Sequence, residues 1–480
     1  MARLRGRIAD ATSGGPLEAK VHVLSSAGKF VAPPDAILKV GSGHPFFYAN
    51  SEFEVELPVG QADVLVERGT EYVPLTRTLQ VPTEGTVEVE LPLSRWTNLP
   101  ERGWHPGNTH IHYDENEKRP DERLRFDSSV EDYSVTVISV LTRRELPYAS
   151  NKYPIGMFTD LTTSHHVVDV GEESRHNSEP WNIGYGHVMF INIRNIVEPV
   201  SRGTLAADLD PDYPPLCWAC DDAREQGGTV IWCHNGQGME APVAAALGKL
   251  HAFNLFDPVW MDPEYRIYYH LLNAGIRLPA STGTDWFVCS SNRVYVNAPG
   301  EFSYGSWLEG LRRGKTFITN GPAVFLSVND SDPGTVLQAG VGRFMVRCRV
   351  SWDSHYPVDA VELVVNGSVA ARHACAEPDT QSWWDAELDI SHDSWLAARL
   401  QGRVRNSFGH FVYAHTSPIY VQMGRPHPSR AASARFLVDG IDGSLKWIES
   451  RGRYATDAQR RDVADLFLQA RGKYAALLEP

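Results

Sequence analysis

The chain has 480 residues, of which 42% are hydrophobic and 22% are charged, and its formal net charge is -14 at pH 7. This length predicts several domains around a sizeable core, and no segment is apolar over the roughly 18 to 20 residues that a membrane helix needs, which excludes membrane insertion. The acidic balance argues against nucleic acid as a partner, because binding to phosphates requires clustered cations.

The N-terminus reads MARLRGRIADATSGG and has no apolar segment typical of a secretion signal. We therefore expect a cytoplasmic protein, with export left open because accessory domains of the kind described below often occur on exported enzymes. Six cysteines are too few for a disulfide scaffold. The one close pair, Cys217 and Cys220, could be a redox or zinc motif, but no second CxxC exists, so helix packing is the favoured interpretation.

Residues 1–99 contain short segments such as KVHVL, FEVEL and VEVELPL, in which apolar and polar residues alternate between Gly, Pro and Ser turns. This alternation predicts a β-sandwich. Residues 100–321 instead alternate apolar strands with helical patterns, which indicates parallel pairing in an α/β barrel or layered α/β sheet. The clearest strands are expected at 135–141, 187–193, 228–234 and 276–285, and helices at about 214–227, 241–251 and 262–274.

Residues 322–425 again favour strands without helices, in AVFLSVN, FMVRCRVSW, AVELVVNG and HFVYAHTSPIYVQM, and predict a second β-sandwich. Residues 426–480 form a predicted helical tail. Its apolar face carries Val463, Leu466, Phe467 and Ala470, so we expect it to pack back on the rest of the chain.

The strongest chemical signal is the segment Gly107 to His112, GNTHIH. Residues two apart in a strand point to the same side, so His110 and His112 present two imidazoles together, as a metal site requires. An HxH motif alone is weak, because histidines recur by chance.

Further donors follow other predicted strands. Glu172 and Glu173 are expected just beyond one strand, His187 begins the next, and His234 and Asp285 fall at the carboxyl ends of two more. In an α/β barrel those ends build the active site. Each residue alone could be an ordinary polar group, but together they match the donor set of hydrolytic Zn, Mn, Fe or Co centres.

In this order, HIH, GEE, GH, CHNG and GTD resemble the PHP (polymerase and histidinol phosphatase) superfamily, in particular its CehA/McbA-type metallohydrolases, relatives of carbaryl hydrolase. The likeness covers about residues 104–325. LLNAGIRLPASTGTD, RVYV and SWLEGLRRGKTFITNGP resemble the closing segment of that subfamily and are more specific than HxH. The resemblance implies a distorted (β/α)7 barrel, here flanked by the two β-sandwiches and the helical tail.

The resemblance also implies a ligand set of two divalent ions. The first would be held by His110, His112, Glu173 and Asp285. Glu173 would bridge to a second ion at His187 and His234, and it is preferred over Glu172 because the family pattern Gly-x-Glu begins at Gly171.

The chain departs from the family at three places where many relatives have a histidine. It has Thr142-Arg143-Arg144 in place of Thr-Asp-His, Asp285-Trp286-Phe287 in place of Asp-x-His, and no further histidine in the loop after His112. All three missing histidines would serve one additional metal, so their joint absence favours a two-metal centre.

These features predict a metal-dependent hydrolase that uses a metal-activated water. The CehA/McbA resemblance implies an ester, amide or carbamate bond as its target. The candidate catalytic residues are Asp285, which could also shuttle a proton, Glu173, Arg143 and Arg144. The two arginines could clamp the substrate, although pairing with Glu145 or Glu172 is an equal alternative. Further candidates around the substrate are Tyr148, Lys152, Tyr153, Arg175, His176, Trp181, Trp286 and Phe287.

Two other functions stay open. One is phosphoester hydrolysis, for which the Arg143-Arg144 pair is the single hint of a phosphate clamp. The other is a non-catalytic metal- or glycan-binding protein. The expected partner is a small-molecule substrate, and the subunit count is open, with a homo-oligomer among the options.

Overall fold

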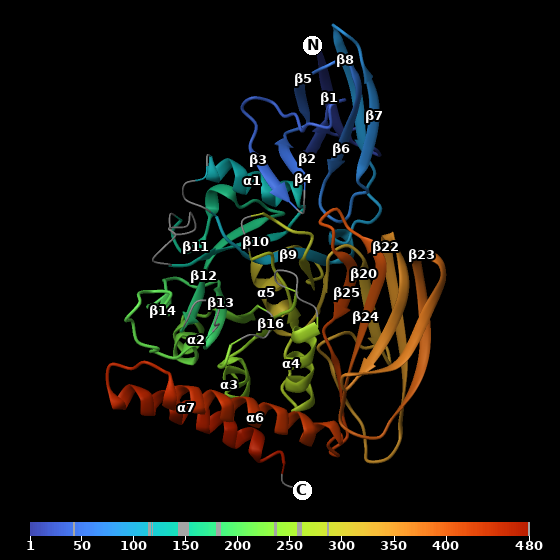
Figure 1. Ribbon diagram of the computed structural model, residues 1–480. Helices are drawn as coiled ribbons and strands as arrows, with labels where there is room; N and C mark the ends of the chain where they lie inside the picture. The colour runs from blue at the N-terminus through green and yellow to red at the C-terminus, as the bar shows by residue number, and fades with distance from the viewer. Residues whose placement is uncertain are drawn as a thin grey trace.

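A computed structural model describes residues 1–41, 44–113, 117, 119–142, 153–178, 184–234, 238–256, 262–285 and 288–478. The N-terminal strands lie at one end of the molecule, an α/β region lies in the middle, and a group of long strands lies beside it (Figure 1). Two helices, drawn in red, run along the end opposite the N-terminal strands. Within the described ranges, no helix combines the length and apolar character that crossing a bilayer requires.

The N-terminal strands form two sheets that share one apolar core. Their strand orders are β5-β1-β8 and β3-β4-β2-β6-β7. Alternation along β1 turns Leu4 and Ile8 into this core and leaves Arg3 and Arg5 outside. The strand bounds are β1 Ala2–Asp10, β2 Ala19–Leu24, β3 Leu38–Gly41, β4 His44–Ala49, β5 Glu52–Leu57, β6 Gly60–Glu67, β7 Leu75–Val81 and β8 Thr86–Leu93.

The middle of the chain mixes strands with helices, which confirms the α/β class. The helices expected at 214–227, 241–251 and 262–274 are confirmed as α2, α3 and α4, with shorter bounds. The elements are η1 Pro100–Arg102, β9 Trp104–Ile111, α1 Pro120–Val130, β10 Val135–Val140, β11 Gly156–Met157, η3 Thr159–Leu161, β12 Val167–Asn177, β13 Gly186–Ile191, β14 Ser201–Gly203, α2 Leu216–Glu225, β15 Thr229–Cys233, α3 Ala241–Ala246, β16 Ala252–Asn254, α4 Asp262–Asn273, β17 Ala280–Ser281, β18 Arg293–Asn297, α5 Tyr304–Arg312 and β19 Thr316–Thr319.

The strands of this region curl into a barrel-like sheet whose pairing is mixed. Parallel ladders join β9 to β10, β10 to β12, β15 to β16 and β16 to β17. Strand β13, however, is antiparallel to both β12 and β15, so the expectation of parallel pairing is wrong there. A parallel bridge between Ile111 and Asp285 brings the segment after β17 back to β9. The start of β13 therefore lies at the same edge as the ends of β12 and β15.

Two strand boundaries differ from those expected. Strand β12 continues through Glu172 and Glu173 to Asn177, whereas both carboxylates were expected beyond its end. The strand expected at 276–285 is reduced to β17, and Asp285 reaches β9 through the bridge instead.

The strands after residue 322 continue the same hydrogen-bonded sheet, because β19 pairs with β25. Two long strands, β23 and β24, were not predicted from the sequence. They lie in the chain between strands that were predicted. The bounds are β20 Ala323–Val328, β21 Val336–Gln338, β22 Phe344–Val365, β23 Ser368–Ile390, β24 Ser394–Arg405, β25 Phe411–Thr416 and β26 Ile419–Gln422.

Helices α6 (Ser429–Ser450) and α7 (Asp457–Ala475) pack against the middle region. Helix α6 contacts α4, and α7 contacts α3. The predicted apolar face of the tail is confirmed, because Val463, Leu466 and Phe467 are among the buried residues of α7 and belong to the central core.

Candidate metal centre

The six candidate ligands meet at one edge of the barrel-like sheet. They come from β9 and the residue after it, β12, β13, the residue after β15 and the segment after β17. His187 reaches this edge from the start of its strand because β13 runs opposite to its neighbours. The sequence analysis named six residues far apart in the chain, and the fold brings all of them together: His110, His112, Glu173, His187, His234 and Asp285.

The first group of donors surrounds the HxH pair. The Nε2 atoms of His110 and His112 are 3.0 Å apart. Glu173 Oε2 lies 3.5 Å from the first and 2.9 Å from the second. Asp285 Oδ1 lies 3.5 Å and 3.4 Å from the same two atoms. One nitrogen or oxygen from each of the four residues thus faces a common point.

The second group uses the other oxygens of the same two carboxylates. Glu173 Oε1 lies 3.0 Å from His187 Nδ1 and 3.5 Å from His234 Nε2. Asp285 Oδ2 lies 3.5 Å from His234 Nε2. Each carboxylate therefore directs one oxygen to each group of imidazoles, an arrangement in which Glu173 could bridge two cations.

The chemistry of the donor set fits divalent cations. Both oxygens of Glu173 are fully buried, and among the described residues neither has a hydrogen-bond partner of good geometry. A buried carboxylate without hydrogen bonds is costly unless a cation neutralises it. The donor atoms of His110, His112, Glu173 and Asp285 lie within 4.8 Å of one another, and so do those of Glu173, His187 and His234. Imidazole and carboxylate donors at such spacing suit Zn, Mn, Fe or Co.

Main-chain hydrogen bonds hold Asp285 against the HxH strand. The Asp285 and Thr284 amides each donate to the His110 carbonyl at 2.8 Å, and the His112 amide donates to the Asp285 carbonyl at 3.1 Å. Gly283 allows this approach, since a Cβ there would lie 2.6 Å from His110 Cβ. The backbone, and not only the side chains, thus fixes three of the ligands relative to one another.

Two imidazoles are oriented by oxygens behind them. His112 Nδ1 donates to the Ser139 carbonyl at 2.8 Å, and His187 Nε2 donates to Asn177 Oδ1 at 2.8 Å. Each contact leaves the opposite ring nitrogen directed at Glu173. Such partners fix the ring and its tautomer for metal binding. The sequence analysis identified neither Ser139 nor Asn177.

The protonation states suit metal ligation. Burial raises the pKa of Glu173, but Arg175 and the imidazoles of His110, His112 and His187 outweigh it and hold the pKa well below its ordinary value. Burial also raises the pKa of Asp285, but the nearby His234 and His110 outweigh it and lower this pKa to about 2. Burial and Arg175 lower the pKa of His187 to about 3. At neutral pH both carboxylates are charged and His187 is neutral, so none of the three must lose a proton to bind a cation.

Glu173, not Glu172, faces the cluster. Glu172 points to the other side of β12, where its Oε2 accepts a hydrogen bond from the Val197 amide at 2.6 Å. Burial raises the pKa of Glu172 to about 8. Alternation along the strand separates the two neighbouring carboxylates completely.

Other candidates have different fates. Arg175 lies beside the cluster, with Nε 3.3 Å from Glu173 Oε1. His176, a candidate near the substrate, instead pairs with Asp212 at 2.9 Å, and Tyr153 donates to Asp121. Several candidates lie outside the described residues: Arg143, Arg144, Tyr148, Lys152, Trp181, Trp286 and Phe287.

The cysteines divide into packing and site-adjacent residues. Cys217 and Cys220 are buried in α2 within the central core, as the packing interpretation predicted. Cys233 was missed. It comes directly before His234, and its sulfur lies within 4.8 Å of donor atoms of His110 and His234. Its position next to a predicted ligand in WCHNG was the available signal.

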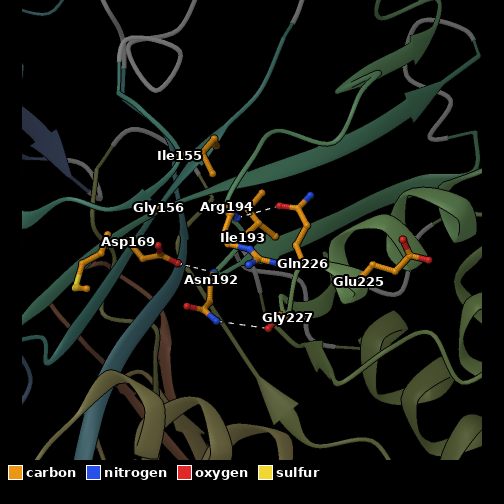
Figure 2. Close-up of a pocket in the computed structure, with 10 residues that line it drawn as sticks. Ile155, Gly156, Asp169, Asn192, Ile193, Arg194, Glu225, Gln226 and Gly227 are labelled. Atoms are coloured by element: carbon orange, nitrogen blue, oxygen red, sulfur yellow. Dashed lines mark hydrogen bonds between the residues drawn. The ribbon is translucent and has the colours of Figure 1, made fainter.

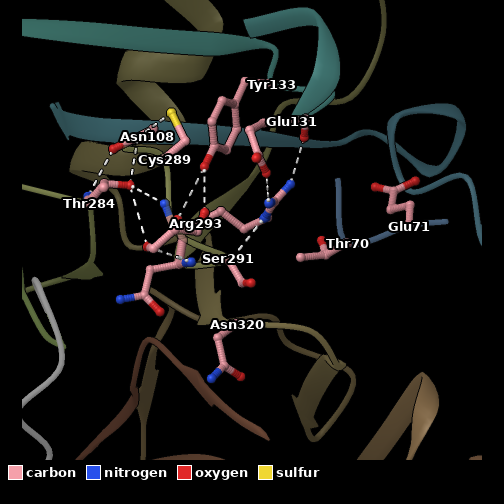
Figure 3. A network of polar contacts seen from close by, with 12 residues as sticks. Thr70, Glu71, Asn108, Glu131, Tyr133, Thr284, Cys289, Ser291, Arg293 and Asn320 are labelled. Carbon is pink, nitrogen blue, oxygen red and sulfur yellow. Dashed lines mark hydrogen bonds and ion pairs between the residues drawn. The ribbon is translucent and has the colours of Figure 1, made fainter. Parts of the chain in front are cut away.

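A buried polar network includes Asn108 of β9 and Thr284, neighbours in the chain of the candidate ligands (Figure 3). Asn108 Nδ2 donates to Thr284 Oγ1 at 2.9 Å, which ties β9 to the residue before Asp285. Further along, Arg293 Nη2 lies 3.1 Å from Glu131 Oε2. Lys20, from the N-terminal sheets, reaches the other Glu131 oxygen at 2.5 Å. Buried hydrogen bonds of this kind connect the centre to the N-terminal region.

A separate cavity of about 550 Å³ lies toward the opposite end of β12 (Figure 2). Asp169, four residues before Glu173, lines it and accepts a hydrogen bond from the Asn192 amide at 2.7 Å. Gln226 and Arg194 also line it. None of the six candidate ligands contributes to its wall, so this cavity is not the metal centre.

No family model and no curated protein matches the chain. Among solved structures, the chain is similar to the apo structure of β-glucuronidase 3 from Bacteroides uniformis, at 10% sequence identity and a TM-score of 0.18. The match covers 89% of this chain, and the chain spans 64% of the length of that neighbour. Similarity at this level supports no statement about fold or function.

Proposed function

We propose that the chain is a metal-dependent hydrolase with a two-cation centre. His110, His112, Glu173 and Asp285 would hold one ion, and Glu173 would bridge to a second ion at His187 and His234. The observation that carries the proposal is the pair of buried carboxylates, each of which directs its two oxygens to two different sets of imidazoles.

The resemblance to CehA/McbA-type members of the PHP superfamily supports this proposal. A distorted (β/α)7 barrel is what that resemblance implies. The described strands β9, β10, β12, β13, β15, β16 and β17 follow one another around the sheet, and the Ile111–Asp285 bridge returns the last to the first. We propose that this ring is the PHP-type barrel.

Divalent ions in such a centre lower the pKa of water toward neutrality and polarise the oxygen of the bond under attack. The protein residues supply position and proton acceptance. Asp285 Oδ2 and His234 Nε2, 3.5 Å apart, form the less buried side of the cluster, where the His234 side chain is 12% exposed. Asp285 is ionised, so Oδ2 is placed to accept a proton there.

Hydrolysis of an ester, amide or carbamate bond is the first choice for the reaction, in line with the CehA/McbA resemblance. Phosphoester hydrolysis is the second, and one observation favours it: the Arg175 guanidinium lies beside Glu173, where it could meet a phosphate.

A hydrolysis screen tests the proposal. Purified protein would be assayed on aryl ester, carbamate and phosphoester substrates with Mn, Zn or Co added, beside His110→Ala, Asp285→Ala and, as a control, the exposed His165→Gln. We expect activity in the wild type and the control. The His110→Ala and Asp285→Ala variants should lose activity by at least about 100-fold, since each lacks one proposed ligand of the first ion. Activity that survives both substitutions would contradict the mechanism. Bound metal without activity on any substrate class would favour a binding protein.

A further inference from the structure

Arg175 lies at the metal centre but is not one of its ligands. It follows Glu173 by two residues on β12, so both side chains lie on the same face of the strand. Its Nε is 3.3 Å from Glu173 Oε1, and the side chain is 9% exposed. The guanidinium is therefore a buried cation at a site that is itself built for cations.

Among the described residues, none accepts a hydrogen bond from this guanidinium. Its Nε is buried without a hydrogen-bond partner, and within the described part of the chain no oxygen accepts a hydrogen bond from its terminal nitrogens. Two other buried arginines differ. Arg202 donates to the carbonyls of Arg175 and Pro199, and Arg293 donates to the carbonyls of Ser291 and Glu131. Arg202 Nε is also without a partner, so an unpaired Nε alone does not set Arg175 apart; the difference is that both other arginines donate through their terminal nitrogens to protein oxygens.

Charge explains why this guanidinium needs an anionic partner beyond those that the described residues supply. Glu173 Oε1 is the one carboxylate oxygen that the described structure places near this guanidinium, and the same oxygen would bind the second cation. Once a cation takes it, the guanidinium faces like charge in a poorly solvated place, which is unfavourable without another anion. A planar guanidinium matches carboxylate and phosphate groups through two parallel N–H bonds.

We infer that Arg175 binds an anionic group of the substrate, a carboxylate or a phosphate, next to the metal centre. The inference rests on the proposed function and narrows it to substrates that carry a negative charge close to the bond that is cleaved. It makes Arg175 a specificity-determining residue.

Anion binding by the metal-loaded protein tests this directly. Inorganic phosphate and benzoate would be titrated calorimetrically into Mn-loaded wild type, Arg175→Gln, Arg175→Lys and the control Arg194→Gln. Arg194 is exposed at the cavity near the other end of β12, so its variant loses the same charge away from the centre. We expect the Arg175→Gln variant to bind at least one anion about 10- to 100-fold more weakly, with metal content and the control unchanged. Which anion is affected distinguishes a phosphate from a carboxylate.

Kinetics give a second readout on matched substrates. The KM of Arg175→Gln should rise for 4-carboxyphenyl acetate or 4-nitrophenyl phosphate. It should stay close to wild type for phenyl acetate, because that substrate has no anionic group for the guanidinium to bind. Should the Gln variant fail to fold or to keep its metal, the Lys variant decides, since a point charge cannot form the two parallel bonds to benzoate.

Three outcomes would overturn the inference. One is wild type that holds metal but binds neither anion, and another is anion affinity unchanged in the Arg175 variants. The third is a KM that rises equally for charged and neutral substrates. The second outcome would leave Arg175 as a counter-charge for Glu173 only. Wild type that holds no metal would instead remove the proposed function, so the two failures are distinguishable.

Discussion

Asp285 is the residue at which backbone and metal chemistry meet. It has a φ of 65°, in the left-handed region that residues other than glycine rarely adopt. Such a conformation costs on the order of 1 kcal/mol or more and persists where neighbouring contacts hold it. Here hydrogen bonds to the His110 and His112 backbone hold it, and they turn the carboxylate between two sets of imidazoles. Strain at this position is a cost that the proposed role of Asp285 as a metal ligand and proton acceptor would explain.

At the same scale, the residues that hydrogen-bond to the ligand imidazoles should influence metal affinity. Replacement of Asn177 by alanine removes the acceptor at His187 Nε2, so the ring is free to turn or to change tautomer. We expect Asn177→Ala to weaken binding of one metal equivalent about 10- to 100-fold, as measured by competition with a chelating indicator. The control is Asn195→Ala, at an exposed site whose recorded contact is through the backbone amide. Equal affinities in both variants would show that Asn177 does not orient His187.

The ligand residues could be named from the sequence, but their supports could not. His110 and His112 are recognisable because their spacing alone puts both on one side of a strand. Asn177 and Ser139 carry no such local pattern. They face the ligands only because the register of β12 with β13 and of β10 with β9 brings them there. Arg175 was one of several candidates, and its buried Nε without a partner is visible only in three dimensions.

At the scale of elements, the direction of β13 is the clearest difference from the sequence prediction. Only residues 178–185 separate β12 from β13, whereas a parallel crossover needs a dozen or more. The short connection was thus a signal for antiparallel pairing that the apolar pattern obscured. Antiparallel pairing matters for function, because it carries His187 to the edge where Glu173 and His234 lie.

Because β9 and the segment after β17 approach closely, position 283 should require glycine. In Gly283→Ala the new Cβ would lie 2.6 Å from His110 Cβ and 2.8 Å from the His110 amide nitrogen. We expect a loss of about 1–3 kcal/mol in the free energy of unfolding, together with weaker metal binding, because His110 must move. Urea unfolding and metal titration measure both effects.

Gly305→Ala is the matched control for this substitution. Gly305 lies in α5 with open space around it, and alanine should leave stability unchanged or raise it by up to about 1 kcal/mol. A Gly283→Ala variant as stable and as well loaded with metal as the control would show that the closure between β9 and Asp285 is looser than described.

At the scale of the whole molecule, the middle region and the C-terminal strands share one continuous sheet. The ladder from β19 to β25 joins them, and helix α4 adds Tyr269, whose hydroxyl lies 2.8 Å from His415 Nε2. The sequence showed the change of pattern at residue 322 but not this continuity, since strand pairing over such a distance has no local signature. We expect the two regions to unfold together.

His415 at this junction makes stability depend on pH. Burial, reinforced by Arg399 and opposed by a hydrogen bond to the Thr416 carbonyl, lowers its pKa to about 3, against about 6.5 in an unfolded chain. Below about pH 6.5 the unfolded state gains a proton that the folded state refuses. Stability is therefore complete above that pH and is lost as pH falls toward 3, by about 1.4 kcal/mol per unit.

The variant His415→Gln should remove this contribution. Its unfolding free energy should fall less steeply than that of the wild type between pH 6 and pH 4, whatever the difference between the two proteins at pH 7. The exposed His165→Gln should keep the wild-type slope. Urea unfolding at several pH values measures the slopes, and identical slopes for wild type and His415→Gln would argue against a buried neutral imidazole.

Anomalous diffraction from crystals of the protein loaded with Mn or Zn tests the two-cation centre most directly. We predict two peaks at the cluster. One should lie within about 2.0–2.3 Å of His110 Nε2, His112 Nε2, Glu173 Oε2 and Asp285 Oδ1, and the other at the same distances from Glu173 Oε1, His187 Nδ1 and His234 Nε2. A metal-loaded crystal with no anomalous density between these residues would contradict the account.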